Sequence, residues 1–439
     1  PGYLIPVSAV AALGGVLFGF DLVIISGAVP FFKVHYALDE VGTGWAVGCI
    51  NLGSAAGALL AGRLSDTLGR KKLLLLCAFL FAATGVGTGW APSFGLFIAA
   101  RMLSGVAVGA AALVAPMYLA EIAPATVRGR LVSFYQLAIT VGLLLAYLSN
   151  YFLLNTGENN WRYMFSSQTA PAVLFFAGLL FVPESPRWLV KRRREREAET
   201  VLTRIGGATY AGTEVTQIRA SFGVETTESV GDLFRPDVRH IVLLGVLIAV
   251  FSQADGQNSL FSYVPEIFAQ AGMGQDTAFL QSVLLGVVNF AFTFIAIRTI
   301  DRVGRRRLLL WGAGLLAAIA TGLAVCFAVG APAVLTLGLV MGFIATFAAT
   351  LGPVTWVALS ELFPNRIRGN AMALATLALW LANFFTTASF PILKENLGLP
   401  GTFLVHAGIC AVYFFLVRRR VPETKGRSLE EIEALLVRK

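Results

Sequence analysis

The stretch LLLWGAGLLAAIATGLAVCFAVGAPAVLTLGLVMGFIATFAATLGPVTWVALS, residues 308–360, contains 53 residues and not one Asp, Glu, Lys or Arg. An α-helix rises about 1.5 Å per residue and the hydrocarbon core of a bilayer is about 30 Å thick, so about 20 apolar residues make one crossing. The stretch does not alternate as the strands of a membrane barrel do. It therefore predicts two membrane-spanning helices.

The rest of the chain has the same character. Hydrophobic residues make up 56% of 439 and charged residues 13%, and the mean hydropathy of +0.74 excludes an ordinary water-soluble domain. Residues 3–32 and 240–269 contain only one and two acids, and the run 73–122 divides around Trp90-Ala91-Pro92. We count twelve helices in an all-α membrane protein. The other segments free of charge, His aside, are residues 41–62, 73–100, 102–120, 131–157, 163–183, 277–297, 369–393 and 396–417.

The basic residues are distributed unevenly between the loops. If the N-terminus is inside, 30 of the 34 lysines and arginines lie in loops on the inner side. Cytoplasmic loops carry such an excess, so we expect a multi-pass protein of the cell (inner) membrane with both termini in the cytoplasm. Membrane topology and contact with anionic lipids explain the basic clusters, and nucleic-acid binding is not expected.

The chain repeats itself at about half its length. GRLSDTLGRKK at 62–72 returns as IRTIDRVGRRR at 297–307, and EIAPATVRGR from Glu121 returns as ELFPNRIRGN from Glu361. VPESPR from Val182 returns as VPETKG from Val421. Six crossings per half give both halves the same orientation, as in transporters whose halves rock about a central site. The expected units are bundles at 1–186 and 239–418, a cytoplasmic helical linker at 187–238 and a cytoplasmic tail helix within 419–439, where SLEEIEALL (428–436) has a helix-capping pattern.

The ordered motifs resemble those of the sugar porter family of the major facilitator superfamily along the whole chain. The pair PESPR and PETKG is typical of sugar porters rather than of the superfamily in general. The motifs are GGVLFGFDLVIISGA, GRLSDTLGRKK, PMYLAEIAPATVRGR, PESPRW, DRVGRRR, GPVTWVALSELFPNRIRG and VPETKG.

This resemblance implies twelve helices in two pseudo-symmetric bundles, the major facilitator fold, with short cytoplasmic helices. The family includes bacterial proton-coupled sugar symporters and is related to facilitative glucose transporters. The resemblance therefore implies alternating access and a carbohydrate or polyol substrate, with transport rather than an enzymatic reaction.

Two charges lie deep in apolar helices. Asp21 is 18 residues from Tyr3, and Arg101 is 20 residues from Glu121 on a helix of opposite direction, so the two can lie at one level. An intramembrane charge costs about 2.5–3.5 kcal/mol on insertion scales, so such residues usually have a role. We predict that Asp21 takes up a coupling proton and that Arg101 modulates its affinity. The alternative is a static salt bridge. Proton symporters of the family carry an acid at the position of Asp21.

Acids and arginines recur at matching helix ends of the two halves. Glu121 with Arg128 corresponds to Glu361 with Arg368, and we expect each Glu to meet the Arg of the opposite half. In the family such residues act as a latch; the alternative is a solvated charged face worth less than about 1 kcal/mol per pair. The expected cytoplasmic gate consists of Asp66, Arg70, Glu121, Arg128, Asp301, Arg305, Glu361 and Arg368.

Polar and aromatic side chains on apolar helices are candidates for binding sugar hydroxyls and C–H faces. Interhelical hydrogen bonding is the alternative for each. Ser252 and Leu379 replace polar residues that the family usually has. Asp255, near a helix break at Gly256, could bind substrate, act as a second proton site or face water. The candidates, at or near sugar-contacting positions of the family, are Gln136, Gln253, Asn258, Asn289, Trp356, Trp380, Asn383 and Asp255.

Other chemistry has no support in the sequence. We find no metal-ligand spacing, no phosphate-binding loop and no nucleophile with its base, so no cofactor and no ATP are expected, and the proton is the coupling ion. The expected partners are a small sugar and the lipid bilayer, with the protein as a monomer. Two other functions remain open: a passive sugar or polyol uniporter, and a sugar sensor that transports little.

Overall fold

The computed structural model of the protein describes residues 2–221, 230–364, 366–425 and 431. Six crossings form the N-terminal bundle, the sixth from two consecutive helices. Its helices are α1 (Leu4–His35), α2 (Glu40–Leu68), α3 (Arg70–Gly89), α4 (Phe94–Ile122), α5 (Ala125–Leu153), α6 (Asn160–Ser167) and α7 (Thr169–Phe181).

The C-terminal bundle repeats this plan, with breaks inside two of its crossings. Within the described residues, eleven helical spans are long and apolar enough to cross a membrane, which with the long last helix agrees with the predicted all-α fold. The helices are α11 (Arg239–Ala254), α12 (Gln257–Gln270), α13 (Gln275–Val303), α14 (Arg305–Val329), α15 (Ala333–Ala349), α16 (Leu351–Leu362) and α17 (Arg368–Arg420).

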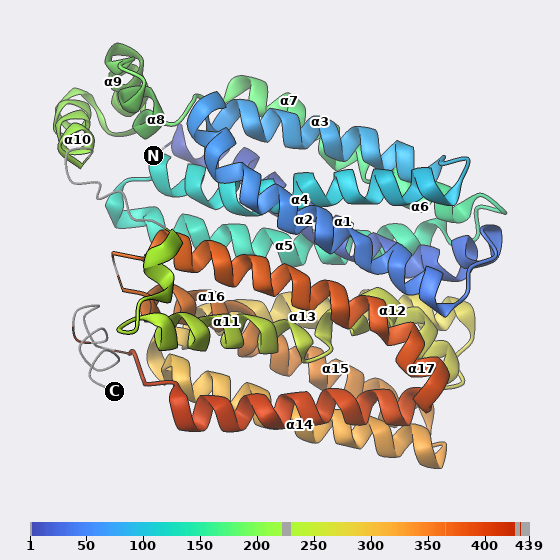
Figure 1. Cartoon of the computed structure of the whole chain (residues 1–439). Coiled ribbons are helices and arrows are strands. Elements are labelled where there is room, and N and C mark those ends of the chain that lie inside the picture. The colour runs from blue at the N-terminus through green and yellow to red at the C-terminus, as the bar shows by residue number, and fades with distance from the viewer. Residues whose placement is uncertain (1, 222–229, 365, 426–430, 432–439) are drawn as a thin grey trace.

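The last helix accounts for the twelfth crossing. α17 has 53 residues, about 80 Å at 1.5 Å per residue, too long for one crossing. Its backbone leaves the helical region at Gly398, where φ is 65°, and Pro400 follows. In Figure 1, α17 turns back on itself beside its label. We call residues 368–397 the first arm and residues 399–420 the second arm. Twelve crossings are therefore confirmed.

The two bundles lie side by side, the N-terminal one above the C-terminal one in Figure 1. Their interface is itself a repeat: α2 packs on α17, α5 packs on α13, and α1 packs on α12. A methyl group in place of the hydrogen of Gly44 would overlap the carbonyl oxygen of Ala388, so a glycine is needed for this backbone approach. The interface is tight enough to place residues of both halves at one site.

A group of short helices joins the bundles: α8 (Pro186–Lys191), α9 (Glu195–Gly206), α10 (Ala208–Ser221) and the 3-10 helix η2 (Val230–Phe234). On α9, Val201, Leu202 and Ile205 are buried, as its pattern predicts. These helices lie at the same end of the bundles as the start of α1 (Figure 1). We call this the linker end and the opposite end the far end. The predicted tail helix at 428–436 lies outside the described residues, except for residue 431.

Candidate functional site

The central feature is a buried ion pair between α1 and α4. The Nη1 atom of Arg101 lies 2.6 Å from Oδ1 of Asp21, and the side chains are 1% and 0% exposed. The prediction that the two charges share one depth is confirmed. Because each charge neutralises the other, the pair can exist in the membrane interior, where either charge alone would be costly.

Two neutral donors complete the surroundings of Asp21. Ser104 Oγ donates to Oδ2, and Gln168 Nε2 lies 3.4 Å from the same oxygen. Arg101 reaches only Oδ1; its Nε and Nη2 atoms have no hydrogen-bond partner among the described residues, and its guanidinium lies 5.6 Å from the centre of the Phe165 ring. The sequence prediction missed Ser104 and Gln168. The spacing of Ser104, three residues after Arg101 on one helix face, was an available signal.

The predicted sugar-binding residues come from helices of both halves. Gln253 and Asn258 meet across the break between α11 and α12, with Asn258 Nδ2 donating to Gln253 Oε1 at 2.6 Å. Trp356 is 40% exposed, whereas the Oδ1 atom of Asn383 is buried and has no hydrogen-bond partner in the described parts of the chain. These side chains lie on α5 (Gln136), α11 (Gln253), α12 (Asn258), α13 (Asn289), α16 (Trp356) and the first arm of α17 (Trp380, Asn383).

One aromatic contact connects the ion pair to these residues. The rings of Phe18 and Trp380 lie 5.9 Å apart across the interface between the halves. Phe18 is one helical turn before Asp21 on α1. A shift of α1 that follows a change at Asp21 would therefore move a ring that touches a predicted sugar ligand.

Asp255 lies inside the C-terminal bundle, beside the break between α11 and α12. The side chain has no exposed surface, and its Oδ1 accepts a hydrogen bond of 2.9 Å from the backbone N–H of Gln257, at the start of α12. The neighbouring backbone contacts are with the second arm of α17, through His406 and Cys410. In this conformation the carboxylate therefore binds the first N–H group of α12, and its role as a sugar ligand stays a prediction.

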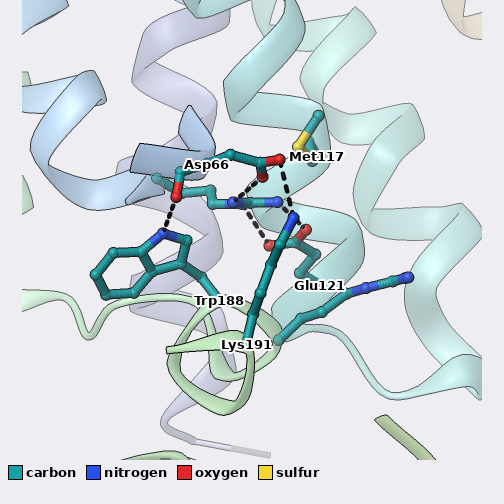
Figure 2. Close-up of a pocket in the computed structure, with 7 residues that line it drawn as sticks. Asp66, Met117, Glu121, Trp188 and Lys191 are labelled. Carbon is teal, nitrogen blue, oxygen red and sulfur yellow. Dashed lines mark hydrogen bonds and ion pairs between the residues drawn. The ribbon is translucent and has the colours of Figure 1, made fainter. Parts of the chain in front are cut away.

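At the linker end, Arg70 organises the charges of the N-terminal half. Its Nε and Nη2 atoms bind both oxygens of Glu121 at 2.9 and 2.8 Å, and Nη1 lies 3.2 Å from Asp66. Such two-point contacts are among the stronger ion pairs. Lys191 of α8 lies 2.9 Å from Asp66, and Trp188 also borders the pocket of about 320 Å³ that these residues line (Figure 2).

A second carboxylate, that of Glu184, stabilises the turn between α2 and α3. It accepts hydrogen bonds from the backbone N–H groups of Arg70 and Lys71, at 2.9 and 3.1 Å, and so caps the start of α3. Burial raises the pKa of the Glu184 carboxyl, although these N–H groups and that of Ser185 act in the opposite direction. Gly69 has a φ of 95° and leaves room for Glu184.

The C-terminal half repeats this arrangement. Arg305 Nη2 lies 3.0 Å from Glu361, and Glu423 accepts from the backbone N–H of Arg305 at 3.0 Å. Thr424 Oγ1 donates to Glu361 at 2.6 Å, as Ser185 donates to Glu121. The motif repeat seen in the sequence is therefore a repeat of contacts.

The expected ion pairs between the halves are not present here. Glu121 and Glu361 each bind an arginine of their own half, while Arg368 donates to the carbonyl of Phe363 at 3.1 Å. Arg128 is exposed. The sequence did not reveal that each glutamate already pairs with an arginine of its own half. Glu121 pairs with Arg70, and Glu361 pairs with Arg305. The side chain of Asp301, another predicted gate residue, lies outside the described part of the structure.

Charges that the sequence analysis did not select join the halves at the far end. Lys33 and Glu40 of the N-terminal half lie 2.6 Å apart, and Lys394 and Glu266 form an ion pair in the C-terminal half. Lys394 also lies 4.0 Å from Glu40, which connects the two pairs across the interface. Tyr147 donates to the carbonyl of Phe261 nearby, again between the halves.

Comparison with known proteins identifies the family. Residues 7–436 match the family described as sugar (and other) transporter. The chain belongs to this family. The transporter is 37% identical to the arabinose-proton symporter of Bacillus subtilis, with 100% of this chain and 96% of that protein covered.

Solved structures add information on conformation. The transporter is similar to the inward-open xylose transporter XylE from Escherichia coli, with a TM-score of 0.89 and 36% identity over 99% of this chain and 100% of that chain. The proton:xylose symporter XylE bound to 6-bromo-6-deoxy-D-glucose matches with a TM-score of 0.80 and 36% identity, over 99% of each chain. The side-chain contacts described above that join the halves are the pair of Phe18 and Trp380 and, at the far end, those of Lys394 with Glu40 and of Tyr147 with Phe261.

Proposed function

We propose that this sugar transporter is a proton-coupled symporter that carries a sugar across the bacterial inner membrane. The observation that carries the proposal is the fully buried pair of Asp21 and Arg101. A transporter without ion coupling has no need to hold two charges in hydrocarbon. The relatives named for arabinose-proton and proton:xylose transport support the same assignment.

Asp21 binds the coupling proton in this mechanism. In the present conformation its carboxylate has a cation and two neutral donors, so the ionised form is well satisfied. Neither Asp21 nor Arg101 is open to solvent. Protonation therefore requires α1 and α4 to separate, and a neutral Asp21 no longer attracts Arg101. No further cofactor takes part.

The sugar binds between the halves. Amides supply both donors and acceptors for hydroxyl groups, and the tryptophan faces supply surface for the C–H side of a sugar ring. Phe18 on α1 contacts Trp380, so proton binding at Asp21 and sugar binding at Trp380 both act on α1. The proposed ligands are Gln136, Gln253, Asn258, Asn289, Trp356, Trp380 and Asn383.

The bundles at 1–186 and 239–418 move relative to each other about this site, and the helical linker 187–238 connects them. The linker end, where the basic loops gather, faces the cytoplasm according to the positive-inside rule. The protein acts as a monomer in the lipid bilayer.

The charged networks at the linker end serve as the cytoplasmic gate. When the cavity faces outward, the ends of α4 and α16 approach the opposite half, and Arg128 and Arg368 become partners for Glu361 and Glu121. The Arg70 and Arg305 contacts hold each glutamate in position for that exchange.

Purified protein in proteoliposomes tests the proposal. D-xylose, L-arabinose, D-glucose and a polyol are offered with and without an inward proton gradient, and solute accumulation is measured together with proton uptake. Symport predicts accumulation above the outside concentration only with the gradient. Uptake that ignores the gradient would demote the protein to a uniporter with a structural Asp21–Arg101 pair. Binding without uptake would identify a sensor.

A further inference from the structure

Oδ2 is the oxygen of Asp21 on which a proton can enter. Arg101 approaches Oδ1 alone, with one nitrogen, and so leaves Oδ2 to the neutral donors Ser104 and Gln168. Gln168 is at 3.4 Å, near the limit of a hydrogen bond, whereas the Ser104 hydroxyl is in close contact. Ser104 is thus the main neutral partner of the oxygen that faces away from the cation.

We propose that Ser104 is a positioning residue of the proton site: its hydroxyl holds Oδ2 of ionised Asp21 and thereby sets the pH at which Asp21 takes up the proton. This inference rests on the proposed function of Asp21 and deepens it. Arg101 neutralises the charge of Asp21. The hydrogen bond from Ser104 sets how readily a proton displaces it from Oδ2.

The chemistry of a hydroxyl suits both protonation states. A serine donates to a carboxylate, and after rotation of its O–H bond it can accept from a carboxylic acid. It can also turn back to the backbone carbonyl four residues earlier on α4. With the proton on Oδ2, Oδ1 becomes a carbonyl oxygen that can still accept from Arg101, which has only donors. Ser104 remains satisfied while Asp21 loads and releases the proton.

The other groups around the Asp21 carboxylate are less suited than Ser104 to hold Oδ2. Arg101 of α4 is the charged partner, and the fully buried thiol of Cys49 on α2 is a further titratable neighbour of the pair. The thiol of Cys49 is bonded to the carbonyl of Ala46. On the α6–α7 side, the neighbours are the neutral Gln168 and the ring of Phe165.

An infrared titration of the purified transporter tests this without any sugar. The carboxylic-acid C=O band that is missing in D21N reports protonation of Asp21, and its midpoint pH is compared in wild type, S104A and S54A. Ser54 is a matched control, since it is fully buried on α2 and its hydroxyl donates to the carbonyl of Ile50, its one partner among the described residues. S104T, which keeps a hydroxyl, is the conservative variant.

Loss of a hydrogen bond to a charged group changes its proton affinity about tenfold or more. We therefore expect the S104A midpoint to move upward by about one pH unit, with S54A unchanged and S104T near wild type. The pH at which gradient-driven uptake is half-maximal should move with it. An S104A midpoint equal to wild type would overturn the proposal for Ser104 while leaving symport intact. A band that titrates normally together with uptake that ignores the gradient would overturn symport instead, and a band absent at every pH would overturn both.

Discussion

Among the residues that the structure describes, each half of the transporter contains one fully buried acid, and the two have different partners. Asp21 and Asp255 are 234 residues apart, close to the repeat spacing, and both have no exposed surface. Asp21 is bound by side chains of other helices. Asp255 is bound by the backbone of its own segment, and its Oδ2 has no hydrogen-bond partner among the described residues.

Under the proposed mechanism, the difference separates an acid that acts as a switch from an acid that stabilises one crossing. A carboxylate that bridges α1 and α4 changes the contact between two helices when its charge changes. A carboxylate that binds the first N–H group of α12 acts within one crossing, beside Gly256, whose φ of 98° turns the chain out of α11. Burial of an acid in a membrane is therefore insufficient to identify a coupling residue; what matters is whether its partners come from elements that move apart.

The largest loss of stability is expected when Arg101, the positively charged partner of Asp21, is replaced. R101L leaves an unpaired buried carboxylate and should lower the stability of the protein by about 3–5 kcal/mol at neutral pH. Thermal unfolding in detergent, followed by size-exclusion chromatography, measures this.

The double variant D21N/R101L is the control, because it removes both charges. It should be clearly more stable than R101L, and R101L should itself recover as the pH falls and Asp21 becomes neutral. Equal losses in the single and double variants would show that Arg101 contributes by packing alone, for example against Phe165, and not by its charge.

D21N should abolish coupling while keeping the fold. One proton moving down 100 mV supplies about 2.3 kcal/mol, enough for about 50-fold accumulation of sugar. Asn cannot exchange a proton, so accumulation should fall to the outside concentration while sugar exchange between equal concentrations continues. Radiolabelled uptake and counterflow in proteoliposomes distinguish the two, with D255N as the matched acid-to-amide variant. Accumulation by D21N at the wild-type level would end the proposed role of Asp21.

The fold was largely predictable because membrane crossings depend on composition. Charge-free runs placed ten of the twelve helices, and the apolar segments 3–32 and 240–269, interrupted by one and two acids, placed the other two. Lys394 with Glu395 separated the two arms of α17 even though the helix bends only at Gly398. The break between α15 and α16 at Thr350 was not predicted, because the charge-free run 308–360 was divided by length alone; Gly352 and Pro353, in the first turn of α16, were an available signal.

The site was predictable where charge and depth sufficed. Asp21 and Arg101 could be paired from their distances along two helices, and Ser104 lies on the Arg101 face of α4, but Gln168 as a partner depends on how the α6–α7 crossing packs against α1, which the sequence does not reveal. The partners of Glu121 also depend on loop packing and on which conformation the halves adopt. Repeat symmetry alone therefore located the duplicated turns but not the partners that Glu121 and Glu361 have in this conformation.

A smaller loss of stability is expected from a substitution at Gly256, next to Asp255. G256A introduces a side chain at a φ of 98° and places its Cβ 2.8 Å from the ring of His406. We expect a loss of stability of about 1–3 kcal/mol. G272A is the control, since Gly272 has a φ of 88° with open space around the added Cβ. The difference between the two variants measures the crowding at His406; equal losses would reduce the effect to backbone strain.

D255N should have the smallest effect, and it bears most directly on the comparison between the two acids. The side-chain oxygen of asparagine accepts a hydrogen bond as that of aspartate does, so the bond to Gln257 can persist and the stability should change by less than about 1 kcal/mol. Gradient-driven accumulation should remain at the wild-type level. D255L, which leaves the buried N–H of Gln257 without this acceptor, should lose about 1–2 kcal/mol and still couple, because the bond acts within one crossing. Loss of accumulation in D255N with retained counterflow would mean that the second half has its own coupling acid and that Asp255, like Asp21, exchanges protons in a conformation other than this one.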